Sequence, residues 1–350
     1  MISFYDTSTL PTEEMLDAIR RATLGDDVYR EDPTVNTLEA MAAELLGKEA
    51  SILMPSGTMA NLVAIIAHAR HGDEVVLEQE SHIVYYETGG IAAIAGCMPL
   101  LVSGERGVLR ADLVEARLRK RNDHYPPTSL ICIENTHNRA GGTITDPEIM
   151  QGLRELADRR ALAMHVDGAR LFNAAVALSI PVRELTENAD SVSVCLSKGL
   201  GAPVGSLLAG SSDFVARARH IRKTLGGGMR QAGIIAAAGI VALEQGTKRL
   251  QEDHANARQL ARELAAIPGI QVDPAAVETN IVLASTAPVG LKADRLVERL
   301  RADYDIRASA RPPHVVRFVT HRGIGMREVR ALVAAIREIL GDAEIGEPEL

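Results

Sequence analysis

A lysine lies where an apolar segment gives way to a glycine-rich turn. Residues 192–196 form a β-prone apolar run that stops at Lys198, and three glycines and a proline follow over residues 199–205. No regular element carries that combination, so a strand is expected to end at this lysine. Burial there favours the neutral amine, which is the form that attacks a carbonyl carbon. Taken alone, the pattern also fits a solvated lysine at the start of a loop.

Four other apolar runs end in polar or charged side chains in the same way. These runs are residues 51–54, 73–77, 129–134 and 162–166. The residues that follow them are Ser56, Gly57 and Thr58, then His82, then Asn135, and then Asp167 with Arg170. Ligands of parallel α/β sheets bind beyond the carboxyl ends of the strands, so these residues are expected to line one edge of a sheet.

This set of side chains matches the requirements of a pyridoxal phosphate (PLP) site. PLP needs a lysine for its carbonyl carbon, an acidic partner that keeps its ring nitrogen protonated, and a helix N-terminus for its phosphate. The stretch from Asp167 to Lys198 has the length of one strand–helix–strand crossover, which places both at neighbouring strand ends. The turn at Ser56 also fits an ordinary helix N-cap.

The order of the predicted elements indicates an α/β protein. Short apolar strands alternate with helices of roughly 10–15 residues, which predicts a mainly parallel sheet wound by βαβ crossovers. From residue 270 the pattern changes to one typical of a smaller α+β domain. We expect residues 1–245 to form an N-terminal arm and a large PLP-binding domain, and residues 246–350 to form a small domain that completes the substrate site.

Composition narrows the class of protein and its partners. The chain has 350 residues, a hydrophobic fraction of 46% and a formal net charge of −8, which argues against nucleic acid or a membrane as partner.

The three cysteines lie in apolar surroundings without metal-ligand spacing, so we expect reduced core thiols and no metal site. There is no leader-like segment and no apolar run long enough to span a bilayer. A cytoplasmic location is therefore expected.

Several long motifs resemble those of the L-threonine aldolases, which are fold-type-I PLP enzymes of the β-eliminating lyase group. The motifs are GDDVY at 25–29, EDPTVN at 31–36, PSGTM at 55–59, DGAR at 167–170, CLSKGLGAPVGS at 195–206 and GGGMRQAG at 226–233. The resemblance covers roughly residues 6–322. It implies an aspartate aminotransferase-like fold and a homotetramer, a dimer of dimers whose sites lie at a dimer interface.

The resemblance also implies roles for individual residues around the cofactor. Lys198 would hold PLP, Asp167 would pair with the ring nitrogen, and His82 would stack on the ring. Arg170 would lie near the ring oxygen and the substrate carboxylate. The remaining cofactor-binding residues are Ser56, Gly57 and Thr58 in the phosphate-binding turn, and Lys223 and Arg230, which reach the phosphate from a neighbouring subunit.

Further residues are implied around the substrate. His124 matches a histidine near the substrate hydroxyl, and Arg317 matches the arginine that binds the carboxylate, with Arg311 as its competitor. The base that removes the hydroxyl proton is left open between His82, His124 and a water that they position.

The sequence departs from the family pattern at two places. The N-terminal arm usually carries a serine near the substrate carboxylate, where this chain has Tyr5. Arg322 stands where an acidic residue is usual. Because a phenol changes the volume of the pocket, Tyr5 suggests a preference for a bulkier or more polar substrate.

These observations together predict a PLP-dependent carbon–carbon lyase. The expected reaction is retro-aldol cleavage of L-threonine, L-allo-threonine or a related β-hydroxy-α-amino acid to glycine and an aldehyde. One alternative is a PLP-dependent transferase that carries out transamination or aldol transfer. Another is a non-catalytic protein that uses the turn at Ser56 to bind phosphate.

Overall fold

The chain divides into two compact units. The computed structural model describes residues 1–120 and 122–343. The larger unit is Leu10–Lys248, and the smaller unit combines Met1–Thr9 with Arg249–Leu350. The sequence pattern places the N-terminal arm with the large domain, whereas the contacts of the arm group it with the C-terminal residues. The functional division near residue 245 stays a prediction.

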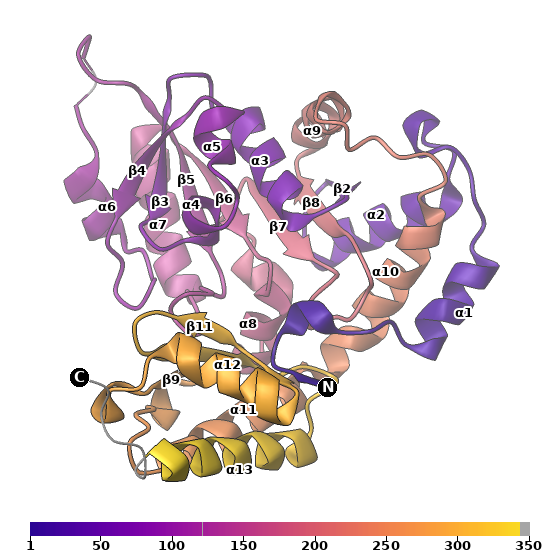
Figure 1. Cartoon of the computed structure of the whole chain (residues 1–350). Helices are drawn as coiled ribbons and strands as arrows, with labels where there is room; N and C mark the ends of the chain where they lie inside the picture. Colours follow the sequence, from indigo (N-terminus) through magenta and orange to yellow (C-terminus); the bar gives the residue numbers. More distant parts are fainter. Residues whose placement is uncertain (121, 344–350) are drawn as a thin grey trace. The chain divides into compact units, whose positions relative to one another are not determined.

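The larger unit is built on a seven-stranded sheet with the order β2-β8-β7-β6-β5-β3-β4. Figure 1 shows these arrows fanning from β4 to β2. In chain order the strands are β2 (Ala50–Met54), β3 (Glu74–Glu78), β4 (Met98–Val102), β5 (Thr128–Glu134), β6 (Ala163–Asp167), β7 (Ser191–Cys195) and β8 (Ser206–Gly210). Every strand except β8 runs in one direction, and β8 is antiparallel to both of its neighbours. The expected mainly parallel sheet is thus confirmed.

Strand β8 is the element that the sequence reading missed. After the glycine-rich turn that follows Lys198, the chain returns beside β7 as an antiparallel hairpin, with Cys195 opposite Ser206 and Ser191 opposite Gly210. Lys198 therefore lies in the hairpin loop between β7 and β8, and the pairing of these two strands fixes both ends of the loop.

Several helices of the larger unit begin at a side-chain cap. Their bounds are α1 (Glu13–Arg21), α2 (Pro33–Leu45), α3 (Gly57–His68), α4 (His82–Tyr85), α5 (Gly90–Ala93), α6 (Ala111–Arg117), α7 (Pro147–Arg160), α8 (Leu171–Leu178), α9 (Ser212–Thr224) and α10 (Gly233–Gln245). Thr12, Asp32, Ser56, Asp146 and Ser211 each accept a backbone N–H of the first turn. No helix within residues 1–120 and 122–343 is long and apolar enough to cross a membrane.

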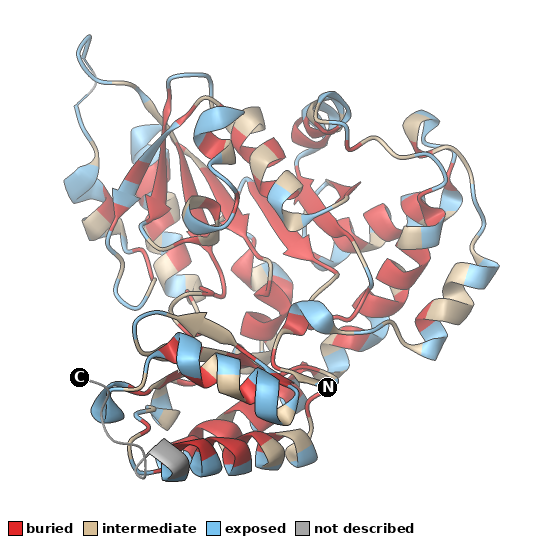
Figure 2. Cartoon of the chain, in the orientation of Figure 1, coloured by how far each residue is buried: buried red, intermediate tan, exposed pale blue. Residues whose placement is uncertain are grey.

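Burial concentrates on the sheet, whose strands are coloured mostly as buried in Figure 2. Helix α3 packs against the sheet with an apolar face that includes Val63 and Ala64, and α9 contributes Phe214 to the same cluster. Because α3 is anchored in this way, its N-terminal turn is held at the carboxyl end of β2. The fold thus fixes one helix start beside the strand ends.

The smaller unit has its own sheets and core. Its elements are β1 (Ile2–Ser3), α11 (Leu250–Ala265), β9 (Ile281–Ser285), α12 (Ala293–Tyr304), β10 (Ile306–Arg307), β11 (Ser309–Arg311), β12 (Val315–Val319) and α13 (Met326–Ala343). Three of these strands form an antiparallel sheet with the order β11-β12-β9. The arm joins the unit because β1 pairs in parallel with β10 and the Phe4 ring packs on Phe318 at 5.7 Å.

Candidate active site

A cavity of about 270 Å³ lies at the carboxyl ends of the strands of the larger unit. It is lined by Pro55, Ser56, Gly57, Thr58, Asn61, His82, Glu87, Asp167, Ala169, Cys195, Ser197, Lys198, Pro203, Val204 and Gly205. The structure therefore brings together six of the predicted site residues, from β2 through the hairpin loop. These six are Ser56, Gly57, Thr58, His82, Asp167 and Lys198.

Lys198 is half-buried in the loop between β7 and β8. The backbone N–H of Gly201 donates to the Lys198 carbonyl at 2.9 Å, and the Leu196 N–H donates to the Gly205 carbonyl at 3.0 Å. Gly201 and Gly205 have φ values of 85° and 108°, which side chains other than glycine rarely adopt. The glycines thus close a tight loop that presents the amine at the cavity.

Asp167 ends β6, next to β7 as expected, and is 3% exposed. Its two carboxylate oxygens are held separately. Oδ1 accepts the Ala169 N–H at 3.2 Å, and Oδ2 accepts the Asn61 side-chain amide at 2.9 Å. A buried carboxylate held in this way presents a fixed negative charge to a cationic group in the cavity.

The start of α3 is an anion-binding arrangement. Ser56 has extended backbone angles, and its hydroxyl oxygen accepts the Met59 N–H at 3.2 Å. The N–H groups of the first turn and the dipole of this 12-residue helix favour a negative group at the same place. Ser56 is thus an ordinary helix N-cap, the second reading that the sequence allowed for this turn, and it also lines the cavity.

His82 is held through both its backbone and its ring. Its backbone N–H donates to the Glu134 carboxylate at 2.6 Å, and its ring Nδ1 lies 2.9 Å from Glu87 Oε1. Sequence reasoning assigned no role to Glu87 or to Asn61, although both line the cavity. Each lies inside or just after a helix, where a single polar residue gives no motif, so the sequence held no signal that singled them out.

Buried carboxylates end β3 and β5, and both lie close to His137. Glu134 also accepts the Asn138 N–H at 2.8 Å, and His137 Nε2 lies 2.9 Å from Glu78 Oε2. Burial alone would lower the pKa of His137, but the hydrogen bond to Glu78 and the nearby carboxylate charges raise it overall. Burial alone would raise the pKa of Glu78, but its hydrogen bonds lower it overall.

These opposite pKa shifts predict a pH-dependent stability. The His137 contribution is fully present below its ordinary pKa of 6.5 and is lost as pH rises through the higher folded-state pKa. The Glu78 contribution is present above its ordinary pKa of 4.5 and is lost as pH falls through the lower folded-state pKa. Their combined stabilisation is therefore largest between pH 4.5 and 6.5.

We expect His137→Gln to lower the free energy of unfolding by about 2 kcal/mol in that window and by less outside it. Urea titrations across pH would measure this difference. The exposed His71→Gln variant is the matched control, and an equal loss at every pH would contradict the ion-pair interpretation.

Two other predicted residues of the larger unit do not line this cavity. His124 lies in an exposed turn before β5, where its backbone N–H donates to Asn122 Oδ1 at 2.8 Å. Arg170 is buried just before α8. Their predicted contacts with substrate stay predictions.

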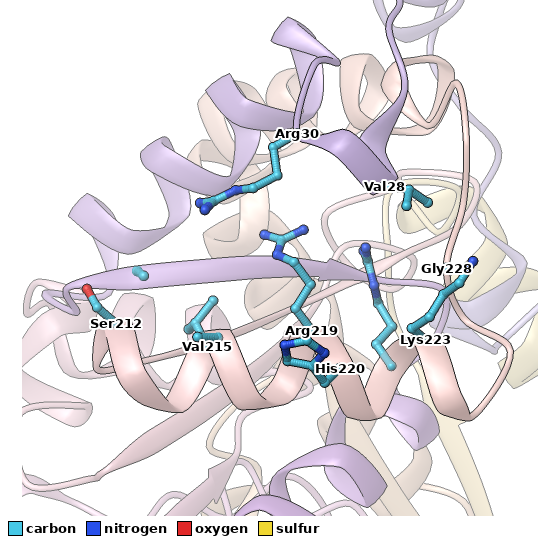
Figure 3. A pocket seen from close by; sticks show the side chains of 11 residues that line it. Val28, Arg30, Ser212, Val215, Arg219, His220, Lys223 and Gly228 are labelled. Atoms are coloured by element: carbon cyan, nitrogen blue, oxygen red, sulfur yellow. The ribbon is translucent and has the colours of Figure 1, made fainter.

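Lys223 lines a second cavity, of about 570 Å³, beside α9 (Figure 3). Its basic lining residues are Arg30, Arg219, His220, Arg222 and Lys223. Arg222 is paired with Asp27 at 2.7 Å and Arg219 with Glu39 at 2.7 Å, so internal carboxylates balance two of these charges. Arg230 is largely exposed and pairs with Asp26 at 2.8 Å. The expected reach of Lys223 and Arg230 into a neighbouring subunit stays a prediction.

Tyr5 and Arg317 belong to the smaller unit. The Tyr5 hydroxyl donates to the Ala308 carbonyl oxygen, so the phenol is anchored within that unit. Arg317 lies on β12, and its guanidinium donates to Ser309 Oγ at 3.3 Å. Their expected roles in substrate binding stay predictions.

The chain is similar in sequence and in fold to known threonine aldolases. The β-eliminating lyase family matches residues 4–287. A probable low-specificity L-threonine aldolase of Arabidopsis thaliana is 48% identical over 281 residues, which cover 79% of each chain. The low specificity L-threonine aldolase of Escherichia coli strain K12 is 42% identical over 336 residues, covering 96% of this chain and 98% of the relative. The crystal structure of a putative L-allo-threonine aldolase from Listeria monocytogenes superposes with a TM-score of 0.81 at 21% identity and 96% coverage of both chains.

Proposed function

Because this chain belongs to the β-eliminating lyase family, and within it to the L-threonine aldolases, we propose that it cleaves L-threonine or L-allo-threonine to glycine and an aldehyde with PLP as cofactor. The named activities of its relatives supply the reaction class. The observation that carries the proposal is the single cavity that combines the Lys198 amine, the Asp167 carboxylate and the start of α3.

The residues of the cavity fit PLP in their chemistry. A primary amine, a buried carboxylate and a capped helix start are the three groups that the carbonyl, ring nitrogen and phosphate of PLP require. The helix start also lies close against the end of β7. A Cβ atom at Gly57 would lie 2.8 Å from the sulfur of Cys195, so only glycine fits between α3 and the end of β7.

This close approach makes Gly57 a sharp test of the phosphate site. We expect Gly57→Ala to displace the first turn of α3 at a cost of about 1–3 kcal/mol. The Kd for PLP should then rise about tenfold. Absorbance titration of the cofactor-free protein with PLP would measure it.

Cys195→Ala removes the atom that a new methyl group would meet. Combined with Gly57→Ala, it should restore most of the lost affinity for PLP, whereas alone it should change the Kd little. Failure of the double variant to regain affinity would show that the contact between Gly57 and Cys195 does not set the phosphate site.

In the proposed reaction, each residue around the cofactor has a separate role. When bound, PLP supplies an electron-poor ring that accepts the electron pair of the breaking Cα–Cβ bond. Lys198 holds the cofactor through its carbonyl carbon, and Asp167 keeps the ring nitrogen protonated. His82 covers the ring. The β-hydroxyl gives up a proton as the aldehyde forms, and Cα gains one to complete glycine.

The remaining assignments follow the family resemblance. Arg170 and Arg317 bind the substrate carboxylate, and His124 lies near the hydroxyl. Lys223 and Arg230 bind phosphate across a subunit interface of a homotetramer. Orientation of the substrate by two arginines lowers the barrier because less freedom is lost in the transition state.

Incubation of the purified full chain with PLP and one amino acid at a time tests the function. Glycine should appear from L-threonine and L-allo-threonine without a second substrate. If Tyr5 favours bulkier substrates, kcat/KM for phenylserine exceeds that for threonine, and a clear threonine preference would refute that part of the proposal. A transferase needs an added acceptor before product forms. A non-catalytic phosphate-binding protein is colourless as purified, and Lys198→Ala then removes no visible absorption band.

A further inference from the structure

Glu87 has a buried carboxyl group that has no role in the reaction proposed above. Glu87 is 6% exposed and follows the short helix α4, next to the cavity. Its Oε1 atom lies 2.9 Å from His82 Nδ1 and accepts a hydrogen bond of 2.9 Å from the Asn61 side-chain amide. One oxygen therefore meets two nitrogen atoms.

The orientation of the Asn61 amide is fixed by its other contacts. Its nitrogen donates one hydrogen to Glu87 and the other to Asp167 Oδ2. Its oxygen lies 2.9 Å from the Ser193 hydroxyl and 3.2 Å from His165 Nε2. Because the nitrogen faces two carboxylates, the oxygen must accept from Ser193 and His165.

The rest of the buried chain agrees with that orientation. His165 is fully buried, and burial lowers its pKa to about 3, so the ring is neutral and carries one proton. If Nε2 donates to Asn61, Nδ1 must accept, and the Ser191 hydroxyl, which lies 2.9 Å from it, is able to donate. The donor and acceptor roles are thus consistent from Ser191 to Glu87.

These roles determine what Glu87 offers to His82. Oε1 accepts the Asn61 N–H, and it remains an acceptor whether or not the other oxygen, Oε2, carries a proton. Burial raises the pKa of Glu87 and the charge of Asp167 adds to this, while hydrogen bonds from His82 and Asn61 oppose it. In either protonation state of Glu87, Oε1 can only accept a hydrogen bond, so His82 Nδ1 must be the donor.

We propose that Glu87 is a positioning residue that keeps the His82 proton on Nδ1 and so leaves Nε2 as a hydrogen-bond acceptor for the substrate hydroxyl or a water bound to it. This inference rests on the proposed aldolase function for its role in the reaction. It selects His82 rather than His124 as the histidine that assists removal of the hydroxyl proton.

Three elements bring titratable groups close to Glu87. Asp167 faces it from the end of β6, His82 from α4, and the Cys132 thiol from β5. Asn61 from α3 is neutral and is hydrogen-bonded to both carboxylates. Asn61 therefore links Asp167, which is proposed to keep the PLP ring nitrogen protonated, to Glu87, which is proposed to orient the histidine.

The tautomer of His82 can be measured without any reaction. The ¹⁵N chemical shifts of its ring nitrogens distinguish a protonated from an unprotonated nitrogen in the full chain labelled at histidine, with and without PLP. The His82→Asn variant identifies the signals. We expect the wild-type protein to carry the proton on Nδ1, and Glu87→Leu to give a mixture of both tautomers.

Kinetics of the PLP-loaded protein test the consequence. Glu87→Leu should lower kcat for glycine release about a hundredfold, within the range of general acid–base effects, with KM nearly unchanged. Glu87→Gln retains an oxygen acceptor and should recover most of this loss along with the Nδ1 tautomer. It also keeps the test available if the leucine variant does not fold. Glu80→Leu, at a partly exposed acid nearby that pairs with Arg139, is the matched control.

The outcomes separate the two proposals. A proton on Nε2 in the wild-type protein, an unchanged tautomer in Glu87→Leu, or a changed tautomer without loss of kcat would each overturn the role of Glu87. Absence of glycine release by the wild-type protein would overturn the aldolase function instead, and the ¹⁵N shifts would still decide whether Glu87 sets the tautomer.

Discussion

Lys198→Ala should abolish glycine release, with a loss in kcat of more than about a thousandfold, because no other amine of the described cavity lining can bind the carbonyl carbon of PLP. Borohydride reduction followed by peptide mass analysis should find PLP attached to the peptide that contains Lys198 in the wild-type protein. In the variant that attachment should be absent, although PLP still binds reversibly at the helix start.

Lys248→Ala is the matched control, since Lys248 is an exposed lysine of the same unit and does not line the cavity. It should keep full activity and full attachment of PLP at Lys198. Substantial glycine release by Lys198→Ala, or attachment of PLP at another lysine in the wild-type protein, would remove Lys198 from the centre of the proposal.

Asp167→Asn should lower kcat roughly 10²–10³-fold, the range seen when one preorganised electrostatic contact to a transition state is removed. The change removes the negative charge that keeps the ring nitrogen of PLP protonated. KM for the amino acid should change little, because the contact strengthens only as electrons enter the ring. Steady-state rates of glycine release would measure both constants.

The same substitution also has a structural cost. The two carboxylate oxygens of Asp167 accept from Asn61 and from the Ala169 N–H, whereas an asparagine has a single oxygen. One donor loses its acceptor, which should cost about 1–3 kcal/mol of stability. Asp146→Asn is the control for an acid-to-amide change, because asparagine caps a helix as well as aspartate does. A variant at Asp167 with wild-type kcat would exclude the proposed pairing.

The strand ends were readable from the sequence because two local signals coincide there. An apolar run stops, and a polar residue follows at once, as at Asp167 after β6 and Ser56 after β2. Since parallel strands of a wound sheet end at one edge, residues far apart in the chain could be placed together before any contact was known. The cavity confirms that placement for Ser56, His82, Asp167 and Lys198.

The hairpin that carries Lys198 was not readable in the same way. Residues 206–210 form a short apolar run after a glycine-rich loop, and such a run does not specify its partner strand. Its antiparallel pairing with β2 depends on contacts between residues far apart in the chain, whereas its pairing with β7 closes a hairpin across the glycine-rich loop. The N-terminal arm is a similar case, because Ile2 pairs with Ile306 across almost the whole chain.

By itself, the sequence determined the wound sheet and indicated both the edge where polar side chains gather and Lys198 as the candidate lysine, because strand periodicity, glycine turns and helix caps are local properties. Only the tertiary structure decided how those groups are oriented. Asn61 from α3 and Glu87 from the segment after α4 meet through a side-chain hydrogen bond, and their roles depend on which atoms donate and which accept within a buried network. That assignment depends on three-dimensional geometry, which no spacing in the sequence encodes.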